Sequence, residues 1–229
     1  KTYATIVKNK QFPQGGRLRV NMGNIYYEQK KYMNAIKMYR MAMDQVLNPS
    51  KEIRFKIRRN IGNAFLKLEK FADAIDNFEA VLEHAKPELT GFPDFITPFN
   101  LLVCYYAIGD ANKMKRAFSR LLMVPKPGTT EEEEEEEKAA EEETHEHKER
   151  DPLRVEVVSR EKEATRMILT GAKLIAPYID QREWVAGYEW VIESLKQDYA
   201  VIASEMEIKK AVTYLRKKQF DKAIEVFKS

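Results

Sequence analysis

The sequence is poor in the side chains that build most catalytic and metal sites. Among its 229 residues are three histidines and one cysteine. A single cysteine excludes a disulfide within the chain and suits a reducing compartment. No glycine-rich phosphate loop, Cys-x-x-Cys pair or His-Glu-x-x-His motif occurs, and no nucleophile has a convincing base nearby. These absences exclude the common enzyme classes, so we expect no catalytic site, no cofactor and no metal site.

Long apolar runs are also missing. The most apolar helical stretch, 167–179, is interrupted by Lys173 and Pro177 and is too short to cross a bilayer. We therefore expect no membrane insertion. The single cysteine, Cys104, lies in an apolar helical stretch, which favours a buried small hydrophobe over a reactive thiol.

Charge is distributed unevenly, although the net charge is only +3. The segment 126–152 has 13 acidic and 4 basic side chains, which leaves 35 basic and 23 acidic residues elsewhere, a net charge of +12. Such a segment has too few apolar side chains to order itself. We expect a disordered acidic insert that serves as a solubilising tether. The alternatives are a solvated single helix and a contact with a basic surface. His145 and His147 lie in it without converging metal ligands.

A pattern of small and aromatic residues recurs between Leu18 and Leu82. The first copy is Gly23, Tyr32, Ala35 and Tyr39, and the second is Gly62, Phe71, Ala74 and Phe78. The steps within each copy are nine, three and four residues, and the copies are 39 residues apart. This pattern is typical of the tetratricopeptide (TPR) repeat, a pair of closely packed antiparallel helices. We expect Ala35 to face Gly23, Tyr32 to close the turn and Tyr39 to pack on the next unit.

Further copies follow along the chain. A third consists of Ala211, Phe220, Ala223 and Phe227 with the same steps. A degenerate copy spans 100–125, where Leu102 and Met114 replace the two small residues. An ordinary helical bundle is the alternative, but bundles do not require a fixed small-aromatic spacing.

The repeats predict an all-α fold, a TPR solenoid that winds as a right-handed superhelix. Neither end of the chain has the polar cap of a terminal repeat, so we expect a fragment of a longer array. The expected parts are the second helix of a truncated repeat (1–12), two repeats (17–48 and 51–86), a degenerate repeat (97–125), the acidic insert (126–152), a divergent helical pair (153–196) and a last, truncated repeat (199–229).

Asparagines recur at equivalent positions of the first helices. Asn21, Asn60 and Asn100 stand two residues before the small position or its Leu102 counterpart, and Asn24 and Asn63 stand one residue after it. First helices line the groove of a TPR array, and asparagine offers both donors and acceptors to an extended peptide backbone. These five residues are therefore the predicted partner-binding groove. The equally supported alternative is that these asparagines are only polar residues that the repeat tolerates at groove positions.

Two other functions for such an array are less well supported. A chaperone adaptor would clamp a carboxylate with lysines, but Val20 stands at the first lysine position, and Ile96 and Asn100 replace the later basic pair. The net charge of +12 outside the insert also suits an RNA-binding helical repeat. RNA-binding repeats often stack bases on aromatic side chains that recur along the groove. The predicted groove positions here carry no such regular series of aromatic residues.

Several segments extend the likeness beyond a generic TPR. They are residues 17–46, residues 104–125, the non-repeat stretch GAKLIAPYID at 171–180 with WVAGYEWVIESL at 184–195, and residues 211–228. In these segments the chain resembles the family of eighty-eight-kilodalton TPR subunits of intraflagellar transport complex B, often called Polaris. The resemblance covers nearly all of the chain except the acidic insert.

The resemblance implies a non-enzymatic scaffold in anterograde ciliary transport and cilium assembly. Its partners would be other complex B subunits, notably an extended segment of the fifty-two-kilodalton subunit, within a large hetero-oligomer. The expected location is the cilium or flagellum, with the basal body and the cytoplasm.

Overall fold

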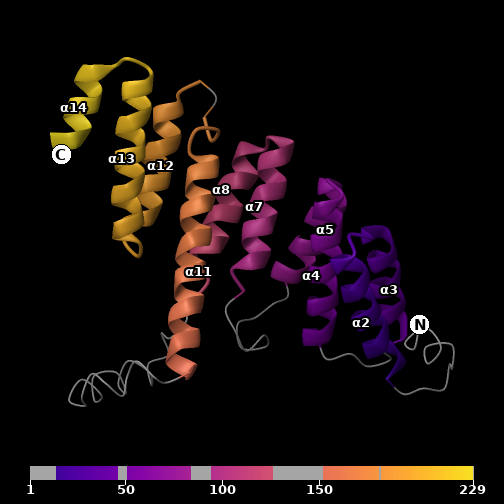
Figure 1. The fold of residues 1–229 in the computed structure, drawn as a ribbon. Helices are drawn as coiled ribbons and strands as arrows, with labels where there is room; N and C mark the ends of the chain where they lie inside the picture. The colour runs from indigo at the N-terminus through magenta and orange to yellow at the C-terminus, as the bar shows by residue number, and fades with distance from the viewer. Residues whose placement is uncertain (1–13, 46–50, 84–93, 126–151, 181, 229) are drawn as a thin grey trace, which may run out of the picture. The chain divides into compact units, whose positions relative to one another are not determined.

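The structure is a computed structural model, and it describes residues 14–45, 51–83, 94–125, 152–180 and 182–228. Within these ranges the only regular elements are helices (Figure 1), as predicted. The expected helix at 1–12, nearly all of the acidic insert and the three histidines lie outside the described residues.

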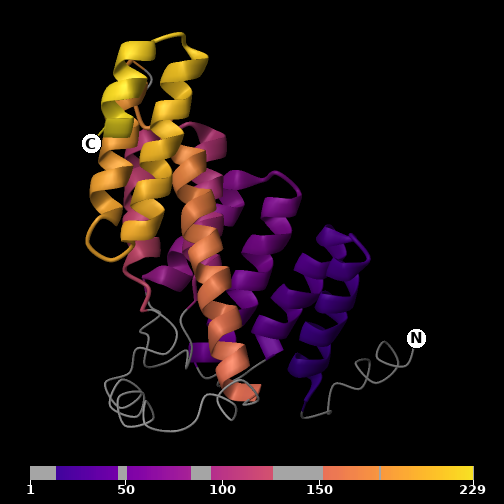
Figure 2. The same ribbon diagram turned by 60° about the vertical axis from the view of Figure 1, so that its left-hand side comes forward.

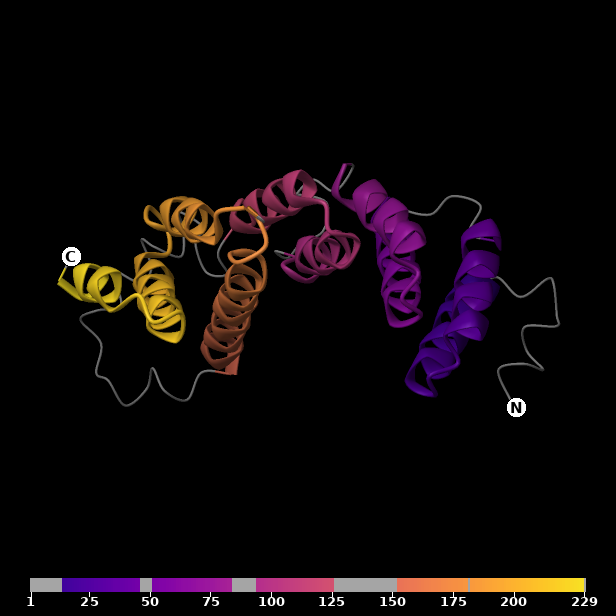
Figure 3. The same cartoon turned by 90° about the horizontal axis from the view of Figure 1, so that it is seen from above.

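The chain divides into two compact units, 1–108 and 109–229. The described helices of the first unit are α2 (Gly15–Glu28), α3 (Tyr32–Gln45), α4 (Lys51–Lys67), α5 (Phe71–Leu82) and α7 (Ile96–Ile108). Those of the second unit are α8 (Ala111–Leu122), α11 (Pro152–Ile175), α12 (Trp184–Leu195), α13 (Ala200–Arg216) and α14 (Phe220–Lys228). In Figure 2 α2 and α3 form an antiparallel pair, and in Figure 3 α13 lies beside both α12 and α14.

The turns that join paired helices share one backbone conformation. Lys30, Glu69 and Lys218 are the described non-glycine residues with positive φ, at 60°, 58° and 58°, and Gly109 has a φ of 75°. Each follows the small position of its copy, or Leu102 in the degenerate copy, by seven residues. A residue in the left-handed region ends a helix with a Schellman pair of hydrogen bonds. Because the four turns occur at the same position of the pattern, they support four copies of one helix-turn-helix unit.

The hydrogen bonds of these turns repeat as well. The N–H of Lys30 donates to the carbonyl of Tyr27 at 2.8 Å, and the N–H of Lys31 donates to the carbonyl of Tyr26 at 2.8 Å. The turns at Glu69 and Lys218 have the same two bonds. Beside the first turn the rings of Tyr27 and Tyr32 meet edge to face, with centroids 5.3 Å apart.

The aromatic residue of the second helix covers the small residue of the first helix in the same repeat. A Cβ added to Gly23 would lie 2.4 Å from the Tyr39 ring, and one added to Gly62 would lie 2.6 Å from the Phe78 ring. The three atoms nearest to a Cβ on Gly23 all belong to the Tyr39 ring, and contact of Ala35 with Gly23 stays a prediction. Ala35 and Ala74 are completely buried.

Helix α7 begins one residue before the expected start of the degenerate repeat at residue 97. The pair Thr97-Pro98 is typical of an N-cap followed by the first helical residue, but α7 starts at Ile96. The carboxylate of Asp94 accepts from the N–H groups of Ile96 and Thr97 at 3.1 and 3.2 Å. Asp94 therefore satisfies donors that the first turn of a helix leaves unpaired.

The second unit has its own close approach of backbone to backbone. A Cβ on Gly187 of α12 would lie 2.1 Å from the carbonyl oxygen of Ala176, just after α11. In the last repeat Ala211 and Ala223 are fully buried. Phe220, at the turn-closing position of the pattern, and Phe227, at the position expected to pack on the next unit, are each 58% exposed.

Candidate interaction surface

The five predicted groove residues all lie on first helices of the first unit. Asn21 and Asn24 lie on α2, Asn60 and Asn63 on α4, and Asn100 on α7. Residues three apart in a helix share a face, so α2 and α4 each present two amides on one side. Asn21 and Asn24 are exposed, and the other three are half-buried.

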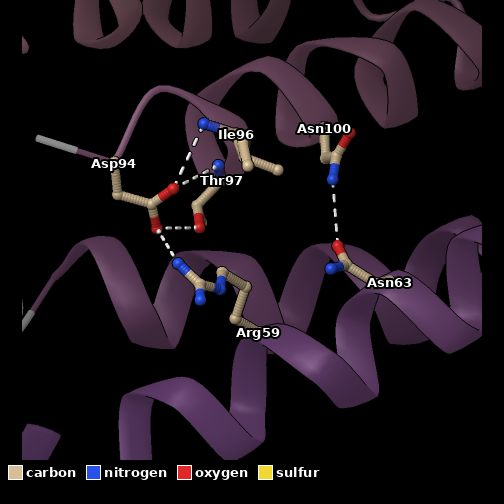
Figure 4. A network of polar contacts seen from close by, with 6 residues as sticks. All are labelled: Arg59, Asn63, Asp94, Ile96, Thr97 and Asn100. Atoms are coloured by element: carbon tan, nitrogen blue, oxygen red, sulfur yellow. Dashed lines mark hydrogen bonds and ion pairs between the residues drawn. The ribbon is translucent and has the colours of Figure 1, made fainter. Parts of the chain in front are cut away.

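Hydrogen bonds join these amides between successive repeats. Asn60 Nδ2 donates to Asn24 Oδ1 at 3.4 Å. Asn100 Nδ2 donates to Asn63 Oδ1 at 2.9 Å (Figure 4). In both pairs the donor stands two residues before the small position, or before Leu102 in the degenerate copy. The acceptor stands one residue after the small position of the preceding repeat. We call the four paired residues the asparagine ladder; Asn21 belongs to neither pair.

A tyrosine within the first repeat also holds the ladder. The hydroxyl of Tyr39 donates to Asn24 Oδ1 at 2.8 Å, so that oxygen accepts from both α3 and α4. Burial, and then the nearby Tyr27 and Glu28, raise the pKa of Tyr39 to about 12. The hydroxyl therefore keeps its proton, and its role as donor, well above neutral pH.

An ionic cluster lies beside the second pair (Figure 4). Arg59 Nη1 lies 3.2 Å from Asp94 Oδ2, and the buried Thr97 hydroxyl donates to the same oxygen at 2.5 Å. The cluster fastens the beginning of α7 to α4. Asn100, one turn further along α7, is thereby held opposite Asn63.

Sequence reasoning missed this cluster. Asp is a preferred N-cap residue whose carboxylate accepts from the N–H groups two and three residues later, and Asp94 just before α7 is the signal that could have located the cap. Arg59, on α4, carries no such local signal. Its partner lies 35 residues away in the sequence, and no local pattern predicts that pairing.

The ladder leaves hydrogen-bonding capacity for a ligand. An asparagine amide has two N–H donors and two acceptor lone pairs. Among the described residues, neither the Nδ2 of Asn24 nor the Nδ2 of Asn63 donates to a partner. The ladder can therefore bridge repeats and still offer donors and acceptors to an extended backbone.

The described residues contain no group of three or more metal-binding side chains. The described helices include none that is both long and apolar enough to span a bilayer. Cys104 is completely buried, and burial raises the pKa of its thiol to about 12. The prediction of a buried small hydrophobe at that position is confirmed.

Comparison with known proteins agrees with the repeat assignment. The tetratricopeptide repeat family model matches residues 16–86. The human intraflagellar transport protein 88 homolog is 42% identical over 229 residues, which is 99% of this chain and 27% of that relative. The chain thus spans about a quarter of the length of the curated relative it matches.

Solved structures of TPR-like repeats are also similar. One, attributed to a kinesin light chain of Podosopora anserina, is 12% identical, with a TM-score of 0.45 over 95% of this chain and 94% of that one. A variant of the same repeats with one substitution is 12% identical, with a TM-score of 0.44 over 94% of this chain and 92% of that one.

Proposed function

We propose that this chain, a tetratricopeptide repeat protein that is 42% identical along 99% of its length to the human intraflagellar transport protein 88 homolog, is a scaffold segment of an intraflagellar transport assembly. In this role it binds partner subunits and catalyses no reaction. The proposed setting is the intraflagellar transport B complex in anterograde ciliary transport, at the cilium or flagellum, with the basal body and cytoplasm as further locations. The identity over the whole chain is the observation that carries this proposal.

The asparagine ladder is the proposed contact surface. It repeats at a regular interval along α2, α4 and α7, and it holds partly unsatisfied amides on each of the first two helices. An extended segment presents backbone N–H and C=O groups at regular intervals, and asparagines can bind them without reading the side chains. An extended segment of the fifty-two-kilodalton subunit is the proposed occupant.

A pull-down with mass spectrometry tests the proposal. The full-length protein, tagged and expressed in ciliated cells, is captured as wild type and as the triple variant Asn24→Ala, Asn63→Ala, Asn100→Ala. The matched control is Asn34→Ala with Asn112→Ala, two exposed asparagines on α3 and α8. We expect the wild type and the control to recover transport subunits and the triple variant to lose the fifty-two-kilodalton subunit.

Other outcomes would change the proposal in defined ways. Recovery that is equal in the triple variant and the control would move the interface away from the ladder while keeping the scaffold. Recovery of chaperones or RNA-binding assemblies alone, from the wild type, would reject the transport function. Circular dichroism of each variant separates loss of contact from loss of fold.

A further inference from the structure

The helix that carries the middle of the asparagine ladder is strongly basic. In α4 the structure describes the side chains of residues 53–67, of which five are basic and none is acidic. Helix α4 bonds to α2 through Asn60 and to α7 through Asn63, so a first helix lies on each side of it. The side chains that α4 exposes are therefore exposed with both neighbouring repeats in place.

Two of these cations lie in line with the ladder. Lys56 stands seven residues before Asn63, and Lys67 stands seven residues after Asn60. Seven residues are nearly two helical turns, so each lysine is turned only about 20° from its asparagine. Both lysines are exposed. We call Lys56, Asn60, Asn63 and Lys67 the ladder face of α4.

The other three cations of α4 add no net charge to this face. Arg54 and Arg58 stand nine and five residues before Asn63, which at about 100° per residue turns them to the far side of the helix. Arg59 lies beside the face, but Asp94 offsets its charge across 3.2 Å (Figure 4). The net charge of the ladder face therefore comes from its two lysines.

The two lysines lie on opposite sides of the ladder amides. They are 11 residues apart, which is about 16 Å along the helix axis, and the two asparagines lie between them. In an extended chain the backbone N–H and C=O groups lie near one plane, and successive side chains point to opposite sides of it. A chain that crosses α4 with its backbone on the amides therefore directs one side chain toward Lys56 and the next toward Lys67.

The equivalent positions of the neighbouring first helices differ in charge. In α2 they are Arg17 and Glu28, 39 residues before the two lysines. In α7 they are Ile96 and Ala107, 40 residues after them, and all four side chains are exposed. The α2 pair carries no net charge, and the α7 pair is apolar, with Ile96 42% exposed. The positive charge beside the ladder is thus concentrated at α4.

We propose that the extended partner segment bound by the ladder carries two acidic side chains where it crosses α4, one facing Lys56 and one facing Lys67, and an apolar side chain where it reaches Ile96. Opposite charges across an interface favour one partner and one register over others. The acidic insert of this chain fits less well as the occupant, since it has no large apolar side chain. This inference rests on the proposed function, because it assumes that the ladder holds the partner's backbone.

Selection from a peptide library tests the charge preference. Random peptides of about twelve residues, which span about 40 Å when extended, are displayed with their C-termini fused to a carrier, so that no terminal carboxylate is free. They are selected on the full-length protein. We expect the peptides that bind the wild type, but not the ladder variant Asn63→Ala with Asn100→Ala, to be enriched in glutamate and aspartate. Because successive side chains point to opposite sides, the two most enriched acidic positions should be an odd number of residues apart.

Substitutions then place the acidic side chains on α4. The double reversal Lys56→Glu with Lys67→Glu should weaken binding of the selected peptides by about tenfold, and should itself select peptides enriched in lysine and arginine. The matched control Arg54→Glu with Lys37→Glu makes the same change in charge at exposed positions away from the ladder face, and should bind the selected peptides like the wild type. The wild-type preference should shrink as salt is raised. Circular dichroism checks the fold of each variant.

Several results would overturn the proposal while leaving the proposed function intact. They are ladder-dependent peptides that are not acidic, acidic positions an even number of residues apart, and a double reversal that binds the selected peptides as tightly as the wild type. Selection of acidic peptides only after deletion of the acidic insert would also overturn it, because the insert would then be the occupant. Peptides that bind the ladder variant as well as the wild type would instead reject the ladder contact of the proposed function, and this inference with it.

Discussion

Asn100 donates to Asn63 across 2.9 Å, although 37 residues separate them in the sequence. The same relationship, one repeat earlier, joins Asn60 to Asn24. An amide that faces an equivalent amide of the next repeat links the two repeats and also fixes its own orientation. The ladder is thus both a contact between repeats and the proposed contact for a partner.

The Asn63–Asn100 bond should appear as a coupling energy. We expect Asn63→Ala and Asn100→Ala each to lower the free energy of unfolding by about 1 kcal/mol. Their double variant should lose less than the sum, with a coupling of about 0.5–1 kcal/mol. Chemical denaturation measures all four proteins, and Asn34→Ala serves as the unpaired control. Strict additivity would show that the bond contributes nothing to stability.

Gly62→Ala should destabilise the first unit, because the added methyl group meets the Phe78 ring at 2.6 Å. Overpacking of this kind costs about 1–3 kcal/mol. The ring is a side chain, so a smaller residue at its position can make room. We therefore expect Phe78→Leu to recover part of the loss in the double variant, as measured by thermal melting. A double variant no more stable than Gly62→Ala would contradict this account.

Gly187→Ala should be more damaging and should not be rescued in that way. The added methyl group would lie 2.1 Å from a backbone carbonyl of Ala176, and only movement of α12 or of the chain after α11 can relieve it. We expect a loss of about 3 kcal/mol or more. Ala186→Gly, one residue earlier in α12, is the control and should cost about 1 kcal/mol. Similar losses for the two would argue against the close approach.

Glu69→Gly should stabilise the protein, since Glu69 has a φ of 58°. A residue with a Cβ pays about 1 kcal/mol in this region, which glycine does not. Part of that gain is offset by the larger freedom of glycine in the unfolded chain. We expect a net gain of about 0.5 kcal/mol in denaturant unfolding. Lys67→Gly, in the last turn of α4, is the control and should be destabilising.

Alkaline pH should weaken the first repeat through Tyr39. Burial raises the pKa of this hydroxyl to about 12 from its ordinary value of 10.0, so the folded state holds the proton more tightly than the unfolded state. The resulting stability is fully present below about pH 10 and is lost as the pH rises toward about 12. Tyr39→Phe should therefore lose less stability than the wild type over that window, as followed by circular dichroism. An identical loss in both proteins would assign the effect to other groups.

The sequence alone predicted the helical fold and the register of the repeats. The reason is local: a glycine or alanine at one position and an aromatic residue sixteen positions later are both required within a single helical pair. It also predicted that the ladder residues would be equivalent, because equivalence follows from the repeat. It did not predict that the Tyr39 ring covers Gly23, since helical periodicity does not specify which second-helix side chain crosses to the first.

Tertiary structure decided the rest. The bond from Asn60 to Asn24 and the ion pair of Arg59 with Asp94 depend on how closely successive first helices lie, a distance set by packing of whole repeats. The spacing of residues along the chain thus determined the unit that repeats, whereas the packing of one unit on the next decided which polar groups meet.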